Sequence, residues 1–127
     1  MGNRILVIDD NESVRKSFEM ALESTDYEVD TVESGEKGIE LAKGKKYDLI
    51  YLDLNMPGLN GVETMRKLKM TTNDVPFYIV TAFHEEYADR LKEVEEEGII
   101  FQLLRKPIGI EQILRYTKIV MEGINEN

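Results

Sequence analysis

The stretch "DLIYLDLNMPGLNG" at residues 48–61 gives the strongest indication of the fold. Four apolar residues, Leu49 to Leu52, are followed directly by the acid Asp53, and Asn, Pro and Gly come soon after. A short apolar run bounded by turn residues is typical of a strand buried on both faces. The sequence therefore predicts a central strand of a sheet that ends in a carboxylate.

Strand-like and helix-like segments alternate along the chain on both sides of this stretch. Strands are predicted at residues 4–8, 27–32, 48–52, 75–82 and 99–104, and helices at 11–25, 35–43, 61–70, 85–97 and 109–122. The helical spacing of apolar residues predicts these inward-facing positions: Phe18, Ala21, Leu22, Ile39, Ala42, Val62, Met65, Leu68, Tyr87, Leu91, Val94, Ile113, Leu114, Thr117 and Val120. Five strands, each followed by a helix, predict an α/β fold whose parallel sheet is covered on both faces. The alternating segment 27–32 is expected nearer an edge of the sheet.

The composition argues against several classes of protein. A chain of 127 residues fits one domain, and the absence of Cys excludes disulfides and thiolate metal sites. The net charge of −9 argues against direct binding of nucleic acid, which needs a basic surface. No apolar run reaches the roughly 20 residues that cross a bilayer, and the first ten residues do not form a signal peptide. We therefore expect a cytoplasmic protein without membrane insertion.

Residues suited to chemistry follow the carboxyl ends of several predicted strands. They are Asp9 and Asp10 after the first strand, Asp53 after the third, Thr81 and Ala82 at the end of the fourth, and Arg105, Lys106 and Pro107 after the fifth. The ligand crevice of an open parallel sheet lies at this edge, so we expect these residues to converge. Three crowded carboxylates need a cation, and Mg²⁺ is the natural one because it prefers oxygen ligands. A carboxylate can also attack a phosphoryl group, whose oxygens Lys106 and Thr81 could stabilise.

Each of these residues also has an ordinary structural explanation. An acid after a strand commonly caps the next helix, so Asp9 or Asp10 alone would indicate a cap more often than a catalytic site. A Lys-Pro pair such as Lys106-Pro107 is common in turns. Asp53 is the least ordinary, because it ends the most apolar strand. The matching positions on successive strands are what favour a functional site.

Four motifs resemble the receiver domain of two-component response regulators. They are "VIDDNESVR" at 7–15, "DLIYLDLNMPGLNG" at 48–61, "YIVTA" at 78–82 and "RKP" at 105–107. The resemblance covers essentially the whole chain and implies a single receiver domain over residues 1–127. It implies a flavodoxin-like (βα)₅ doubly wound parallel sheet with strand order 2-1-3-4-5.

The resemblance also implies a role for each site residue. Asp53 matches the phosphorylated aspartate of the family. The implied Mg²⁺ ligands are Asp10, Asp53 and the backbone carbonyl of Asn55, with Asp9 acting through water. Thr81, Ala82 and Lys106 match the residues that switch and bind the phosphoryl group, and the Lys106–Pro107 bond is expected to be cis. Asn55 and Phe83 stand where relatives tune dephosphorylation, and the aromatic Phe83 predicts slow decay. Val14, Pro107 and Ile108 are the implied contacts for a docking partner.

The implied reaction is transfer of a phosphoryl group from a phosphohistidine on a sensor histidine kinase or phosphotransfer protein. The domain is then a signalling phosphoacceptor rather than an enzyme, although it assists its own phosphorylation and autodephosphorylation. Its downstream protein target is not identified by the sequence. One position departs from the family: many relatives carry Tyr or Phe three residues before the lysine, whereas this chain has Leu103, with Phe101 two residues earlier.

Two other functions remain to be weighed. The segment "YLDLN" at 51–55 faintly resembles the nucleophile strand of haloacid-dehalogenase-like phosphatases. Those enzymes place a second acid where this chain has Asn55. A pseudo-receiver that is never phosphorylated is the second alternative, and the presence of all the key residues argues against it.

Overall fold

The computed structural model describes residues 3–56, 58–72, 75–82 and 84–123. Strands and helices alternate in the order β1 (Arg4–Ile8), α1 (Glu12–Leu22), β2 (Glu28–Val32), α2 (Gly35–Gly44), β3 (Leu49–Leu52), α3 (Gly61–Thr71), β4 (Phe77–Thr81), a 3₁₀ turn (His84–Tyr87), α4 (Ala88–Glu96), β5 (Phe101–Arg105) and α5 (Ile110–Glu122). All four strand pairings are parallel. The sheet order is β2-β1-β3-β4-β5, which confirms the predicted α/β class and strand order.

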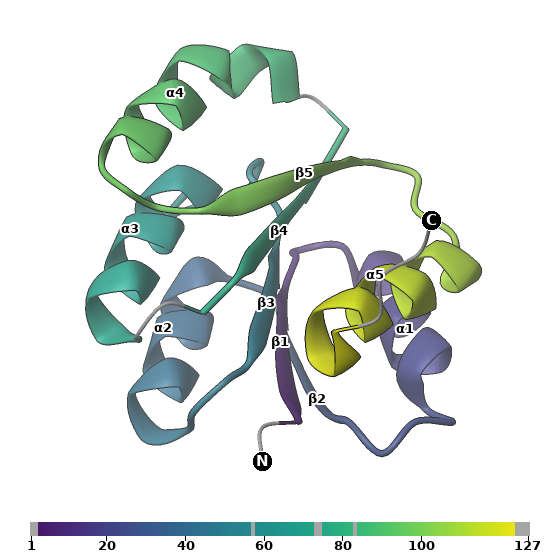
Figure 1. The fold of residues 1–127 in the computed structure, drawn as a ribbon. Coiled ribbons are helices and arrows are strands. Elements are labelled where there is room, and N and C mark those ends of the chain that lie inside the picture. The colour runs from purple at the N-terminus through teal and green to yellow at the C-terminus, as the bar shows by residue number, and fades with distance from the viewer. Residues whose placement is uncertain (1–2, 57, 73–74, 83, 124–127) are drawn as a thin grey trace.

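Helices cover both faces of this sheet. Figure 1 shows α1 and α5 on one side and α2, α3 and α4 on the other. The two layers have separate apolar cores, because successive side chains of a strand point to opposite faces. Leu6 and Ile8 of β1 face the α2–α4 side, whereas Ile5 and Val7 face α1 and α5.

The central and edge strands differ as the sequence predicts. β1, β3 and β4 are buried along almost their whole length, whereas β2 at one edge is partly exposed. The inward-facing positions are confirmed: most are buried, and the partly buried ones, Ile39, Tyr87, Leu114 and Val120, still pack against a core.

Several predicted boundaries are wrong by one to three residues. The first predicted helix begins only at Glu12, because the side chain of Asn11 caps it by accepting from the backbone N–H groups of Ser13 and Val14. The predicted segment 75–82 contains strand β4, which begins at Phe77, after a proline that has no N–H for a strand ladder. The predicted helix at 85–97 opens instead as the 3₁₀ turn, and α4 itself starts at Ala88.

Among the described residues, none of the helices combines the length and the apolar character that a bilayer crossing needs.

Candidate functional site

Two carboxylates meet at the carboxyl ends of the neighbouring strands β1 and β3. The backbone N–H of Asp53 donates to the carbonyl of Ile8 (2.9 Å), and that of Asp9 donates to the carbonyl of Val32 (3.1 Å). These bonds extend the ladder past the strand ends and fix both backbones. The side chains of Asp9 and Asp53 are buried, at 3% and 5% exposure.

Asp10 completes a group of three acids. One carboxylate oxygen from each of Asp9, Asp10 and Asp53 lies within 4.8 Å of the other two, and Asp10 is exposed. The cap of α1 is Asn11 and not an acid, so helix capping does not account for Asp10. Asp9 directs one oxygen to the backbone N–H of Asn11 (2.9 Å). Clustered carboxylate oxygens are the donors that a hard divalent cation prefers, so the cluster is compatible with a divalent metal site.

The loop that follows Asp53 depends on a glycine. A Cβ on Gly61 would lie 2.4 Å from the backbone oxygen of Asp53 and 2.5 Å from Cα of Leu54. Gly61 also donates its N–H to the carbonyl of Leu54 (3.0 Å), and Gly58 has a φ of 76° that favours glycine. The backbone segments therefore approach closely here, and this contact holds the start of α3 against the end of β3.

Lys106 brings the positive charge into the acid cluster. Its Nζ lies 2.9 Å from Oδ2 of Asp9 and 3.5 Å from Oδ2 of Asp53. Its backbone N–H donates to the carbonyl of Thr81 (3.1 Å), which fixes the lysine beside the end of β4. The Lys106–Pro107 peptide bond is cis, as the resemblance implies.

Burial and neighbouring charge shift the acidity of Asp53. Burial raises its pKa most, the negative charge of Asp9 raises it further, and the charge of Lys106 lowers it, leaving the pKa at about 6. The backbone N–H of Asn55, which donates to Oδ1 of Asp53 (3.3 Å), also favours the ionised form. Asp53 is thus an ionised carboxylate at neutral pH that is held in an unfavourable environment.

The remaining residues predicted for the site lie around this cluster. Thr81 is fully buried as the last residue of β4, and Ala82 is exposed beside it. Asn55 is exposed, and its side-chain oxygen accepts a long hydrogen bond from the hydroxyl of Tyr87 (3.5 Å). Sequence reasoning placed Tyr87 only in the core and missed this contact. Phe83 lies outside the described residues.

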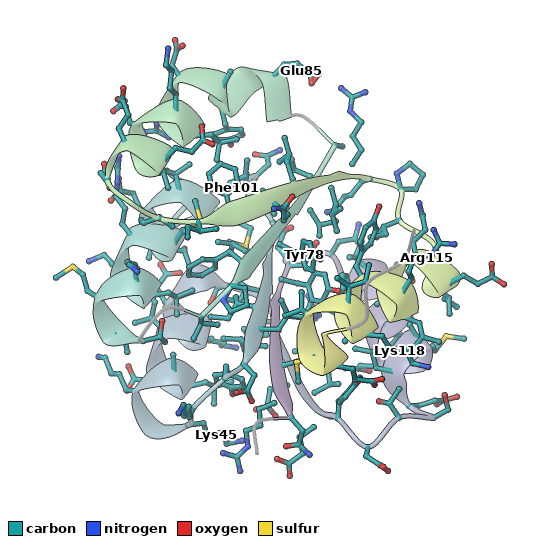
Figure 2. The ribbon with its side chains drawn as sticks, viewed as in Figure 1. Lys45, Tyr78, Glu85, Phe101, Arg115 and Lys118 are labelled. Carbon is teal, nitrogen blue, oxygen red and sulfur yellow. The ribbon has the colours of Figure 1, made fainter. Side chains whose placement is uncertain are left out.

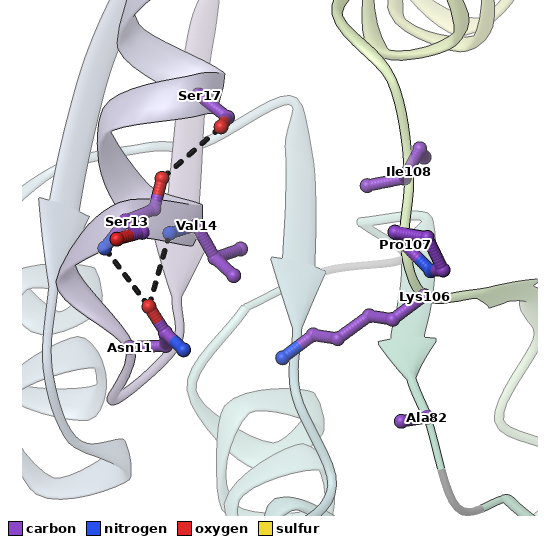
Figure 3. Close-up of a pocket in the computed structure, with 8 residues that line it drawn as sticks. All are labelled: Asn11, Ser13, Val14, Ser17, Ala82, Lys106, Pro107 and Ile108. Atoms are coloured by element: carbon purple, nitrogen blue, oxygen red, sulfur yellow. Dashed lines mark hydrogen bonds between the residues drawn. The ribbon is translucent and has the colours of Figure 1, made fainter.

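Val14, Pro107 and Ile108, predicted as docking residues, line one pocket of about 390 Å³. Figure 3 shows α1 on one side of it and the segment from Lys106 to Ile108 on the other. The same pocket is also lined by Asn11, Ser13 and Ser17, which the sequence motifs did not indicate as docking residues. Ser13 and Ser17 are four residues apart in α1, and this spacing could have indicated a shared face.

The position that departs from the family lies on the edge strand β5. Leu103 is 38% exposed, whereas Phe101 packs against the core on the side of α2, α3 and α4. Figure 2 labels Phe101 on β5 and Tyr78 on β4, and Tyr78 belongs to the core on the opposite face of the sheet, beneath α1 and α5. The aromatic residue of β5 therefore packs against a core, and the exposed position 103 carries a leucine.

Comparisons with known proteins agree with this geometry. A model of the response regulator receiver domain family matches residues 5–118. Response regulator MprA of Mycolicibacterium vanbaalenii is 32% identical over 114 residues, which cover 90% of this chain and 48% of that protein. Cell cycle response regulator CtrA of Brucella ovis is 38% identical over 78 residues, which cover 61% of this chain and 34% of that protein. The chain thus spans about half the length of MprA, or less for CtrA.

A solved structure shows the same fold. The chemotaxis protein CheY4 of Vibrio cholerae superimposes with a TM-score of 0.81 at 27% identity, over 95% of this chain and 100% of that one. The match to the family model covers most of the chain, and the acids and the lysine of the motifs converge at one edge of the sheet. This chain therefore belongs to the response regulator receiver domain family of two-component signalling.

Proposed function

We propose that Asp53 accepts a phosphoryl group from a phosphohistidine on a sensor histidine kinase or phosphotransfer protein. The observation that supports this most is the position of Asp53, buried among two further acids with the ammonium of Lys106 beside it. A carboxylate oxygen of Asp53 forms the new bond to phosphorus, the bond from phosphorus to the imidazole nitrogen breaks, and the imidazole leaves. The product is an aspartyl phosphate.

Mg²⁺ is the cofactor proposed for this site. Asp10, Asp53 and the backbone carbonyl of Asn55 would hold the ion, with Asp9 acting through water, and the ion would offset the negative charge of the phosphoryl oxygens. The exposure of Asp10 leaves room for the waters that Mg²⁺ keeps. Asp9 is already engaged with Lys106 and with the N–H of Asn11, which suits an indirect role.

The residues of the chain then receive the phosphoryl group. Lys106 pairs with one of its oxygens, while the hydroxyl of Thr81 and the backbone beside Ala82 donate hydrogen bonds to it. The added charge of about −1.5 to −2 changes the contacts at the end of β4, and a partner-binding surface responds. Hydrolysis of the acyl phosphate reverses the change, and Asn55 and Phe83 tune the approach of water.

The pocket lined by Val14, Pro107 and Ile108 is the proposed contact for the phosphodonor. It lies against the site, because Lys106 and Ala82 line it as well. A donor seated there would present its histidine close to Asp53. Residues 1–127 form one receiver domain in this proposal, which works in the cytoplasm and signals to a downstream protein.

Labelling with a small phosphodonor tests the proposal. We expect acetyl phosphate with Mg²⁺ to add one phosphoryl group, which intact-mass spectrometry detects. Asp53→Asn should abolish the labelling, and Asp48→Asn, at the opposite end of β3, should keep it. No labelling of the wild-type protein would favour a pseudo-receiver, and labelling that persists in Asp53→Asn would remove Asp53 from its role. Turnover of a small phosphate ester would favour a phosphatase.

A further inference from the structure

Two buried hydroxyl groups connect β3 to α5. The phenol oxygen of Tyr51 lies 2.7 Å from Oγ1 of Thr117, and both side chains are buried. Tyr51 precedes Asp53 by two residues, and side chains two apart on a strand point to the same side of the sheet. The hydrogen bond therefore joins the strand that carries the phosphoacceptor to the last helix of the fold.

The ring of Tyr51 is held in place by other aromatic rings. Its centroid lies 4.6 Å from that of Phe18 on α1 and 5.3 Å from that of Tyr78 on β4. Tyr78 in turn contacts Tyr116 of α5, at 5.6 Å. Figure 2 labels Tyr78 between the sheet and α5. Because packing fixes the ring, the hydroxyl of Tyr51 can reach Thr117 only when α5 is in its present position. A displacement of α5 would break the bond.

The pair is not fully satisfied. Among the described residues, neither hydroxyl makes a second hydrogen bond. Two hydroxyls that share one hydrogen bond leave one proton without an acceptor, which is costly in a buried place. A threonine in a helix can also donate to the carbonyl four residues earlier, which here belongs to Ile113. Rotation of the Thr117 side chain would therefore exchange the bond to β3 for a bond within α5, which gives a second arrangement.

The same helix is also linked to the site at its other end. Lys106, which contacts both Asp9 and Asp53, lies four residues before α5 begins at Ile110. A phosphoryl group on Asp53 would draw Lys106 to new contacts and so act on the start of α5. If α5 then moves relative to β3, the buried bond between Tyr51 and Thr117 must break; if the bond persists, α5 stays in place.

We propose that the Tyr51–Thr117 hydrogen bond couples the state of Asp53 to the position of α5. This inference rests on the proposed function, because it requires that the site is occupied in signalling. Tyr51 is a positioning residue in this role, since it acts through Thr117 and does not reach the phosphoryl group. The bond opens or re-forms as α5 moves, and its two arrangements give the helix two preferred positions.

Hydrogen exchange of the α5 backbone amides tests the coupling. The wild-type protein is measured with and without beryllofluoride and Mg²⁺, which mimic the phosphorylated site. We expect the exchange rates in α5 to change at least about fivefold, the lower end of typical coupling between two sites. Tyr51→Phe and Thr117→Val each remove one hydroxyl with little change of shape. In both variants, the change in the logarithm of the exchange rates should be less than about half of the wild-type change.

Two variants serve as controls. Thr117→Ser keeps the hydroxyl and should preserve the response. Tyr116→Phe makes the same ring change on α5 without touching the pair and should also preserve it. Labelling by acetyl phosphate should stay within about twofold of the wild-type rate in all four variants, because none of them alters a residue that we place in the site.

The outcomes separate this inference from the function on which it rests. A wild-type protein that does not bind beryllofluoride would contradict the proposed function. A wild-type response that Tyr51→Phe and Thr117→Val both leave unchanged would overturn the coupling, even if both variants are less stable. If one of the two does not fold, the other decides; if neither folds, the bond is required for folding itself and the coupling is rejected.

Discussion

Two clusters of this protein each pair a lysine with a buried or half-buried acid, and their surroundings shift the pKa of the acid in opposite directions. The site cluster contains Asp9, Asp53 and Lys106, and its acids are almost completely buried. The Asp30 cluster contains Asp30, Lys45 and Tyr47, with the carboxylate of Asp30 accepting from Tyr47 (2.5 Å) and Lys45 (3.2 Å).

The pKa values of Asp53 and Asp30 are shifted in opposite directions. In the site cluster burial and the charge of Asp9 raise the pKa of Asp53 to about 6. In the Asp30 cluster burial also opposes ionisation, but the hydrogen bonds from Tyr47 and Lys45 outweigh it and lower the pKa of Asp30. An acid surrounded by donors is stabilised in its ionised form, whereas an acid that is buried beside another acid is ionised at a cost in stability. Three paired substitutions test this contrast.

A large effect is expected where the backbone itself is crowded. Gly61→Ala would force a Cβ against the backbone of Asp53 and Leu54, and we expect it to lower the free energy of unfolding by about 3 kcal/mol. Gly44→Ala, next to Lys45, meets no atom within 4 Å and should raise stability by about 0.5 kcal/mol through better helix propensity. Urea unfolding of both variants measures the pair. The same change in the free energy of unfolding in both variants would mean that the close approach at Gly61 does not constrain the site.

Removal of each lysine should also separate the clusters. Lys106→Met leaves two buried carboxylates without their cation, so we expect a loss of about 3 kcal/mol at pH 7 in the absence of divalent cations. Added Mg²⁺ should recover part of that loss. Lys45→Met removes an exposed ion pair and should cost less than about 0.5 kcal/mol. Thermal unfolding with EDTA and with Mg²⁺ compares the two, and an equally small loss in Lys106→Met would show that its charge is not needed by the acids.

Replacement of each acid should give changes of opposite sign. The pKa of Asp53 is higher in the folded protein than the ordinary value of 3.8, so the folded state holds the proton more tightly. Stability therefore falls as pH rises through about 6, and Asp53→Asn should be more stable than wild type by about 2 kcal/mol at pH 7 without metal. Near pH 4 this advantage should nearly vanish. Asp30→Asn should instead lower stability at pH 7, and its cost should shrink as the pH falls, because the pKa of Asp30 is lowered.

Urea unfolding at pH 4, 5.5 and 7 follows both acids. A destabilised Asp53→Asn at pH 7 would mean that Lys106 satisfies the carboxylate fully. The contrast between the two clusters would then lie in burial alone.

The sequence by itself determined the order of strands and helices and the identity of the acids at the strand ends. These features are local, because a buried strand reads as an apolar run and a covering helix as a periodic one. The run Leu49–Leu52 thus indicated a central strand, and the residues of 27–32 indicated an edge, and both predictions are confirmed. Two helix boundaries were wrong, since the side-chain cap at Asn11 and the 3₁₀ turn at His84–Tyr87 leave no mark in the apolar spacing.

Only the tertiary structure decided what those acids experience. Asp9 and Asp10 are adjacent in sequence, yet one is buried against Lys106 and the other faces solvent. Three further features likewise depend on contacts between segments that are far apart in sequence or fold back on each other. They are the pKa of Asp53, the close approach of Gly61 and the bond between Tyr51 and Thr117. Burial and charge act through space, so a local pattern names the residues of a site but cannot give their distances or their energies.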